Sequence, residues 1–143
     1  MPTRKANAVW NGTIKEGHGQ LSVESGTLEA ADYSFSSRFE NGAGTNPDEL
    51  LGAAEAGCFS MAFSMVLTEA GYAPDKIETS ASVELKVNGE DISIPTIELD
   101  CTASVAEIDD DEFQELAEAA RANCPVSKAL GGVDIRLNAR LQS

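Results

Sequence analysis

The chain has 143 residues, a length typical of one domain with its own hydrophobic core, so we expect a single domain over residues 1–143. Its 24 acidic and 10 basic residues give a net charge of −14, which repels nucleic-acid phosphates and anionic lipid headgroups and argues against both as partners. Three cysteines without a CxxC pair, and one histidine, offer too few ligands for a zinc site, so neither a metal nor a cofactor is expected. No apolar segment opens the sequence, which favours a cytoplasmic protein with reduced thiols.

The first part of the chain is expected to form short strands. Residues 5–38 contain β-prone runs separated by glycine-rich turns such as EGHG (16–19). Arg38 is expected to close the last of these strands, YSFSSRF (33–39), and residues 40–46 are expected to form a loop. Arg38 would thereby reach the edge of the core.

A long helix is expected to follow this loop. In NPDEL (46–50), Asn46 is a suitable N-cap and Pro47 suits the first helical position. The helix is expected to continue to about Ala70 and to end at Gly71. At roughly 1.5 Å per residue it is about 36 Å long, which is as long as a small domain is wide.

The apolar residues of this helix point in every direction around its axis. They are Leu50, Leu51, Phe59, Met61, Phe63, Met65, Val66 and Leu67. A helix that is apolar on all faces must be covered on all faces, and a few strands of one small chain cannot readily do this. Small residues offer a second helix a surface for close approach: Gly52, Ala53, Ala54, Ala56 and Gly57. We therefore predict an obligate homodimer with two such helices at its centre.

The second half of the chain is expected to alternate strands and helices. The expected elements are a strand over 77–87 ending in the hairpin turn NGED (88–91), a strand over 96–105, a helix over 109–123, a short helix opened by Cys124 and Pro125, and a strand over 133–141. In the strand over 96–105, alternate side chains are expected to face the core: Ile97, Leu99, Cys101, Ala103 and Val105. This order of elements indicates an α+β fold.

The three cysteines have different expected surroundings. Cys101 lies on the inward face of a predicted strand and is expected to be a core residue. Cys124 precedes a proline and is expected at a helix N-cap, where the helix dipole favours a thiolate. Cys58 lies in the middle of the long helix, so only a nearby cation could ionise it. The candidates are His18, in a turn, and Arg38.

The order of several motifs resembles the osmotically inducible protein C (OsmC) family, which is related to the organic hydroperoxide resistance proteins. The resemblance lies in the run RFENGAGTNPDELLGAAEAGCFSMAFSMVL (38–67) and in the distant CPVSKAL (124–130), and it extends over the whole chain. It implies a thiol-dependent peroxidase of oxidative and osmotic stress defence. It also implies an intertwined homodimer in which antiparallel sheets wrap around two long central helices.

The resemblance further implies roles for individual residues. Cys58 would be the peroxidatic cysteine, Cys124 the resolving cysteine that forms a disulfide with it, and Arg38 the group that activates the thiolate. The family's carboxylate falls on Asp48, where many relatives have Glu, so the shorter side chain is expected to contact Arg38 more loosely. Glu49 is the alternative carboxylate, although its position suits a capping box and its side chain points about 180° away from Cys58.

The distance between these residues indicates a shared site. Asp48 and Cys58 are ten residues apart in one helix, about 15 Å of axial rise, so their short side chains cannot touch within one chain. Either Arg38 bridges part of this gap or the second subunit supplies one of the groups. Apolar residues near the thiol are expected to receive an alkyl or lipid hydroperoxide: Phe59, Met61 and Phe63.

Other functions remain open on the sequence alone. The enzyme would need an external dithiol reductant, for which the resemblance suggests a lipoyl protein, and hydrogen peroxide is a second possible substrate. A non-catalytic dimeric stress protein that binds a hydrophobic ligand is the main alternative. A cysteine hydrolase that uses Cys58 and His18 is a third reading, which the exposed turn around His18 disfavours.

Overall fold

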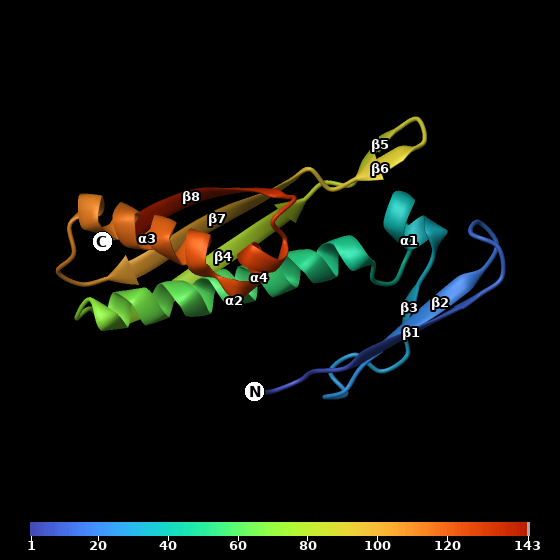
Figure 1. Ribbon diagram of the computed structural model, residues 1–143, viewed down its shortest axis with the longest axis horizontal. Helices are drawn as coiled ribbons and strands as arrows, with labels where there is room; N and C mark the ends of the chain where they lie inside the picture. Colours follow the sequence, from blue (N-terminus) through green and yellow to red (C-terminus); the bar gives the residue numbers. More distant parts are fainter. Residues whose placement is uncertain (143) are drawn as a thin grey trace. The chain divides into compact units, whose positions relative to one another are not determined.

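The computed structural model describes residues 1–142 and consists of two compact units, Met1–Leu50 and a second unit that begins at Leu51. The first unit contains an antiparallel sheet of three strands in the order β1-β2-β3, namely β1 (Ala6–Asn11), β2 (His18–Val23) and β3 (Ala31–Tyr33). A short helix, α1 (Phe35–Phe39), follows, and the long helix α2 (Pro47–Glu69) begins in this unit (Figure 1). The predicted strands and long helix are therefore present.

Arg38 lies in a helix, which corrects the prediction of a strand over 33–39. Helix α1 forms because Ser34 caps it: the Ser34 side chain accepts a hydrogen bond from the Ser37 amide, and the Ser37 hydroxyl accepts one from the Ser34 amide. This reciprocal capping box satisfies two backbone donors that a strand would have paired with a neighbouring strand. The alternating serines therefore open a helical turn.

The second unit contains a three-stranded sheet in the order β4-β7-β8. Its strands are β4 (Pro74–Val83), β7 (Thr96–Val105) and β8 (Asp134–Gln142). A separate hairpin joins β5 (Lys86–Asn88) to β6 (Asp91–Ser93) through the predicted turn. The predicted strand over 77–87 is thus divided, because residues up to Val83 pair with β7 and those from Lys86 pair with β6.

The sheet of the second unit is mixed, which corrects the prediction of antiparallel sheets. Strands β4 and β7 are antiparallel, whereas β7 and β8 are parallel. Two helices connect β7 to β8, namely α3 (Asp110–Asn123) and α4 (Pro125–Ala129). A connection of this length carries the chain back to the starting edge, so β8 runs in the same direction as β7.

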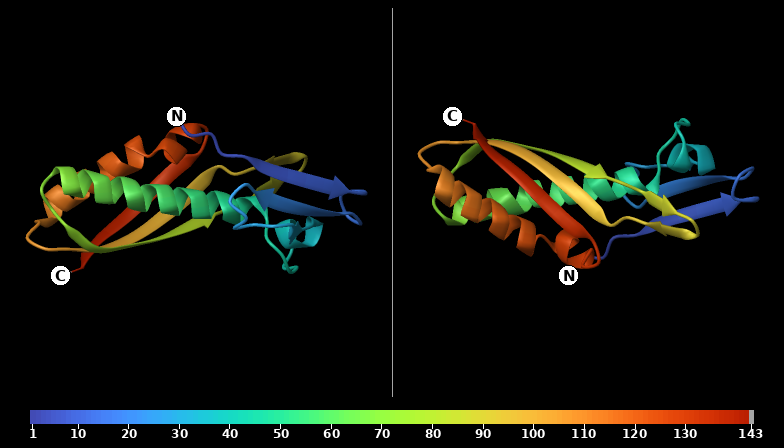
Figure 2. Two further views of the ribbon diagram at one scale, coloured as in Figure 1. Left: turned by 90° about the horizontal axis from the view of Figure 1, so that it is seen from below. Right: turned by 90° about the horizontal axis from the view of Figure 1, so that it is seen from above.

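The core of the second unit lies on one face of this sheet. The predicted inward side chains of β7 are all buried, and helices α2 and α3 cover them. Figure 2 shows α2 in front of the sheet in one view and behind it in the other. Aromatic rings join the two helices, since Phe63 of α2 lies 5.6 Å from Phe59 and 5.3 Å from Phe113 of α3, measured between ring centroids. The α+β class is therefore confirmed.

Helix α2 begins and ends as predicted. The Asn46 side chain accepts a hydrogen bond from the Glu49 amide at 2.8 Å, and Gly71, with a φ of +95°, follows the last turn. Gly52 packs on β4, where an added Cβ would lie 3.2 Å from a methyl carbon of Val83. Small size at position 52 thus serves packing within one chain.

The exposed face of α2 is apolar. Met61 is 77% exposed and Met65 is 59% exposed, although both belong to a helix otherwise packed on the sheet. The helix is also long and apolar enough to cross a membrane by length and composition alone. Its buried face includes Glu55 and packs against the sheet.

Candidate active site

Two cysteines that are distant in the sequence lie together in the second unit. Cys58 is half-buried on α2, and Cys124 is fully buried at the N-cap of α4. The Cys124 side chain lies close enough to the Cys58 thiol to influence its ionisation by a hydrogen bond and by charge. Both thiols are free. The predicted N-cap position of Cys124 is also confirmed.

The surroundings of Cys58 within the second unit favour the neutral thiol. Burial is the largest of the effects that raise the pKa of Cys58, followed by the hydrogen bond with the Cys124 side chain. The charge of Glu55 raises this pKa further, whereas the backbone amide of Val126 lowers it. A thiol with a raised pKa reacts slowly at neutral pH, so a peroxidatic role for Cys58 would require a cation in addition to these groups.

Arg38 and Asp48 form an ion pair in the first unit. The Arg38 Nε lies 3.4 Å from Asp48 Oδ2, and Nη2 lies 3.3 Å from Oδ1, so the guanidinium meets the carboxylate through two nitrogens. Asp48 is almost fully buried, while about a third of the Arg38 side chain is exposed. Both contacts are longer than is usual for a hydrogen bond between charged groups. Glu49, the alternative carboxylate, instead accepts a hydrogen bond from the Thr45 hydroxyl at 2.7 Å.

A network of hydrogen bonds fixes the loop between α1 and α2. The buried Ser37 hydroxyl donates to the Thr45 carbonyl at 2.8 Å, and the Asn46 side-chain amide donates to the Ser37 carbonyl at 3.0 Å. Arg38 and Asp48 flank these residues on either side of the loop. The local sequence therefore holds the ion pair through backbone contacts that do not depend on either charged group.

The apolar residues predicted to receive substrate do not lie on one common surface. Phe59 and Phe63 are fully buried in the core, one helical turn apart, whereas Met61 projects from the exposed face of α2. Side chains at positions i and i+2 of a helix point in different directions, which explains the separation. The two phenylalanines stabilise the helix that carries Cys58, and Met61 belongs to a separate surface.

The remaining candidates lie outside this arrangement. Cys101 is fully buried on β7 between Thr79 of β4 and Ala139 of β8, as expected for a core residue, and burial raises its pKa. His18 is exposed at the start of β2. Within residues 1–142, no three His, Cys, Asp or Glu side chains gather in a way that could hold a metal ion.

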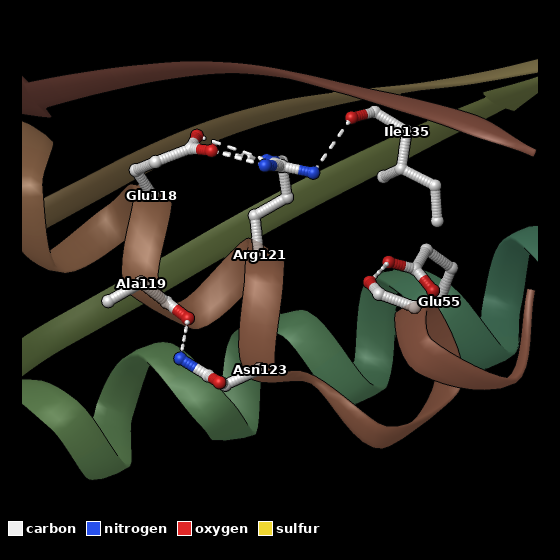
Figure 3. A network of polar contacts seen from close by, with 7 residues as sticks. Glu55, Glu118, Ala119, Arg121, Asn123 and Ile135 are labelled. Carbon is white, nitrogen blue, oxygen red and sulfur yellow. Dashed lines mark hydrogen bonds and ion pairs between the residues drawn. The ribbon is translucent and has the colours of Figure 1, made fainter. Parts of the chain in front are cut away.

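Glu55 is a polar residue beside the thiols that the sequence analysis did not single out. It is fully buried on α2, one turn before Cys58, and its Oε1 accepts a hydrogen bond from the Ser127 hydroxyl of α4 at 2.5 Å. Figure 3 shows this contact and, apart from it, the ion pair of Glu118 with Arg121. Glu55 lies three residues before Cys58, and Ser127 lies three residues after Cys124, but nothing in the sequence indicates that these two turns meet.

The fold and the facing thiols define an α+β protein with a dithiol site. The chain belongs to the OsmC family: the family model described as OsmC-like protein matches residues 40–138. Peroxiredoxin OsmC of Escherichia coli strain K12 is 44% identical over 140 residues, which cover 98% of this chain and 97% of the relative. Organic hydroperoxide resistance protein OhrB of Bacillus subtilis strain 168 is 31% identical over 120 residues, covering 83% and 87%.

Solved structures share the fold. The crystal structure of OhrB of Bacillus subtilis aligns with a TM-score of 0.64 at 28% identity, over 96% of this chain and 98% of that one. An OsmC-like protein of unknown function from Vibrio cholerae aligns with a TM-score of 0.77 at 15% identity, over 97% and 99%. The second likeness concerns the fold alone. These alignments agree with the family match and with the mixed α+β architecture described above.

Proposed function

We propose that this protein is a cysteine-based peroxidase that reduces organic hydroperoxides to alcohols. The observation that carries the proposal is the meeting of Cys58 and Cys124, which lie far apart in the sequence: the Cys124 side chain forms a hydrogen bond with the Cys58 thiol and raises its pKa. The names of the relatives, a peroxiredoxin and organic hydroperoxide resistance proteins, support a peroxidase-type role. A protein that only bound a hydrophobic ligand would have no use for two reduced thiols in contact.

The first step is an attack by the Cys58 thiolate on the terminal oxygen of the hydroperoxide. The oxygen–oxygen bond breaks, the sulfur becomes a sulfenic acid, and the alkoxide takes up a proton and leaves as the alcohol. Cys124 then condenses with the sulfenic acid, giving a Cys58–Cys124 disulfide and water. An external dithiol, for which a lipoyl protein is our candidate, reduces the disulfide and restores both thiols.

Arg38 supplies the cation that Cys58 needs. A guanidinium keeps its charge at any relevant pH, so its approach to the sulfur favours the thiolate and opposes the effect of burial. It would also stabilise the negative charge on the departing alkoxide. Asp48 holds the guanidinium through two contacts, which supports a role in aiming Arg38.

The active protein is proposed to be a homodimer in which the two subunits share each site. The exposed apolar face of α2 around Met61 and Met65 supports this assembly, because a second copy would cover it. About 15 Å of helix separates Asp48 from Cys58, so the Arg38–Asp48 pair serving a given thiol is proposed to come from the partner subunit.

Mixed dimers test the shared site. Cys58→Ser and Arg38→Met subunits, each inactive alone, are mixed, unfolded together and refolded. If the site is shared, each mixed dimer regains one intact site, and activity recovers to about a quarter of the wild-type value. If both groups come from one chain, the mixture stays inactive.

A peroxide titration tests the function itself. The reduced protein is treated with limiting tert-butyl hydroperoxide, and its thiols are counted. Rapid loss of two thiols for each hydroperoxide consumed, together with formation of tert-butanol, is expected. A protein that loses no thiol, or that loses thiols without forming the alcohol, would be a binding protein and not a peroxidase. Hydrogen peroxide in a parallel titration measures the preference for an organic substrate.

A further inference from the structure

The buried carboxyl group of Glu55 has an oxygen without a partner. Oε1 is satisfied by the Ser127 hydroxyl, but no hydrogen-bond donor among residues 1–142 reaches Oε2. Glu55 is fully buried, and burying a carboxylate oxygen without a partner is costly. Such an atom in a packed interior calls for a function, and its open acceptor capacity suits it to receive a proton.

Glu55 is connected to both cysteines through the helices that carry them. It precedes Cys58 by one turn on α2, so the two side chains lie on neighbouring positions of the same helix face. Its partner Ser127 occupies the third position of α4, one turn after the N-cap residue Cys124, and side chains at these two positions of a helix start lie next to each other. Glu55 therefore contacts the turn that carries the resolving sulfur and sits on the helix that carries the peroxidatic sulfur.

The other charged group that faces this carboxylate is already engaged. The charge of Glu55 acts on Arg121 of α3, as it does on Cys58. The Arg121 guanidinium, however, donates to both oxygens of Glu118 and, through Nη1, to the Ile135 carbonyl at 3.3 Å. Figure 3 shows that these contacts point away from Glu55. Arg121 therefore places a positive charge near Glu55 but donates no hydrogen bond to Glu55 Oε2.

We propose that Glu55 is the general base of the disulfide-forming step. This inference rests on the proposed peroxidase function. As the Cys124 sulfur leaves its position in the reduced protein to attack the sulfenic sulfur of Cys58, its thiol proton passes to Glu55 Oε2, which no donor reaches before that movement. The bond between the Cys58 sulfur and its oxygen breaks, and Glu55 returns the proton to the departing hydroxide, which leaves as water. No oxidant or reductant beyond the hydroperoxide is needed, and Glu55 ends in its starting form.

Four substitutions, one of them a control, separate a base from a structural tether. Glu55→Gln retains an oxygen that accepts from Ser127 but cannot take a proton. Ser127→Ala removes the hydrogen bond and leaves the carboxylate. Glu69→Gln, an exposed position at the end of α2, is the matched control for loss of one acidic charge from the same helix. Glu55→Asp keeps a carboxylate on a shorter side chain and is expected to retain much of the rate.

The experiment mixes each reduced protein rapidly with one equivalent of tert-butyl hydroperoxide. Intact mass at successive times separates the sulfenic form, which gains one oxygen, from the disulfide form, which loses two hydrogens. In Glu55→Gln the sulfenic acid is expected to appear at close to the wild-type rate, which also shows that the site is folded. Conversion to the disulfide is expected to slow at least about tenfold near neutral pH, a loss typical of a missing general base.

The pH dependence distinguishes the base from a residue that only positions α4. In alkaline solution the solvent removes thiol protons unaided, so the deficit of Glu55→Gln is expected to shrink above a pH of about 9. A deficit that stays the same at every pH would overturn the proposal. So would a normal disulfide rate in Glu55→Gln combined with a slow rate in Ser127→Ala, which would make Glu55 a tether. If the wild-type protein forms neither the sulfenic acid nor the disulfide, the proposed peroxidase function is refuted, and the inference about Glu55 is refuted with it.

Discussion

The exposed apolar face of α2 allows a direct test of the proposed dimer through Met61→Lys. Full burial of a methionine side chain contributes about 1.5–3 kcal/mol. Met61 and Met65 are 77% and 59% exposed in a single chain, so covering both in two subunits would contribute about 4–8 kcal/mol to association. Lysine is chosen because it makes the net charge of this acidic chain less negative, so a loss of association cannot result from added negative repulsion.

Met61 contributes about 2–5 kcal/mol of this association free energy. Losing that contribution in Met61→Lys is expected to raise the dissociation constant of the dimer by at least roughly thirtyfold. Sedimentation velocity over a range of concentrations measures the shift. Ala122→Lys, at an exposed position of α3, is the control and is expected to leave the dimer intact. Thermal unfolding checks that each variant remains folded. A wild-type monomer at all concentrations, or a Met61→Lys dimer as tight as the wild type, would refute the reasoning.

Further predictions concern the thiols. Burial and the Cys124 side chain raise the pKa of Cys58, so removing the cation in Arg38→Met should move the alkylation of Cys58 by iodoacetamide to higher pH; an unchanged pH midpoint would contradict the role of Arg38. Cys58→Ser should abolish peroxide turnover in a coupled assay, and full activity would refute its assignment. Cys124→Ser should make one equivalent of alcohol and then stop at the sulfenic acid, detected by dimedone labelling. Cys101→Ser should lower the free energy of unfolding in urea by about 1–3 kcal/mol without a catalytic defect, because the hydroxyl enters a buried strand.

Much of the fold follows from local sequence patterns. The alternation along β7 was sufficient to predict which side chains are buried, because a strand with one covered face repeats every two residues. The start of α2 was likewise predictable from Asn46 and Pro47, whose effects are confined to one helical turn. The direction of β8 was not predictable from alternation, because the pattern is the same in parallel and antiparallel strands.

The site was less accessible to sequence reasoning. Arg38 was placed on a strand because residues 5–38 contain β-prone runs separated by glycine-rich turns, whereas the capping box of Ser34 and Ser37 makes a helix. The importance of Glu55 depends on its contact with Ser127, which lies far along the chain and comes close only in the folded protein. Contacts of this kind are set by packing between elements, and the spacing of residues within either element does not reveal them.

The central claim is that Cys58 and Cys124 form a peroxide-driven redox pair. Its most direct test is peptide mapping by mass spectrometry after the reduced protein reacts with one equivalent of tert-butyl hydroperoxide. The account predicts a disulfide between the peptides that contain Cys58 and Cys124, with Cys101 still a free thiol. A link that involves Cys101, or oxygen accumulating on Cys58 without any disulfide, would contradict it.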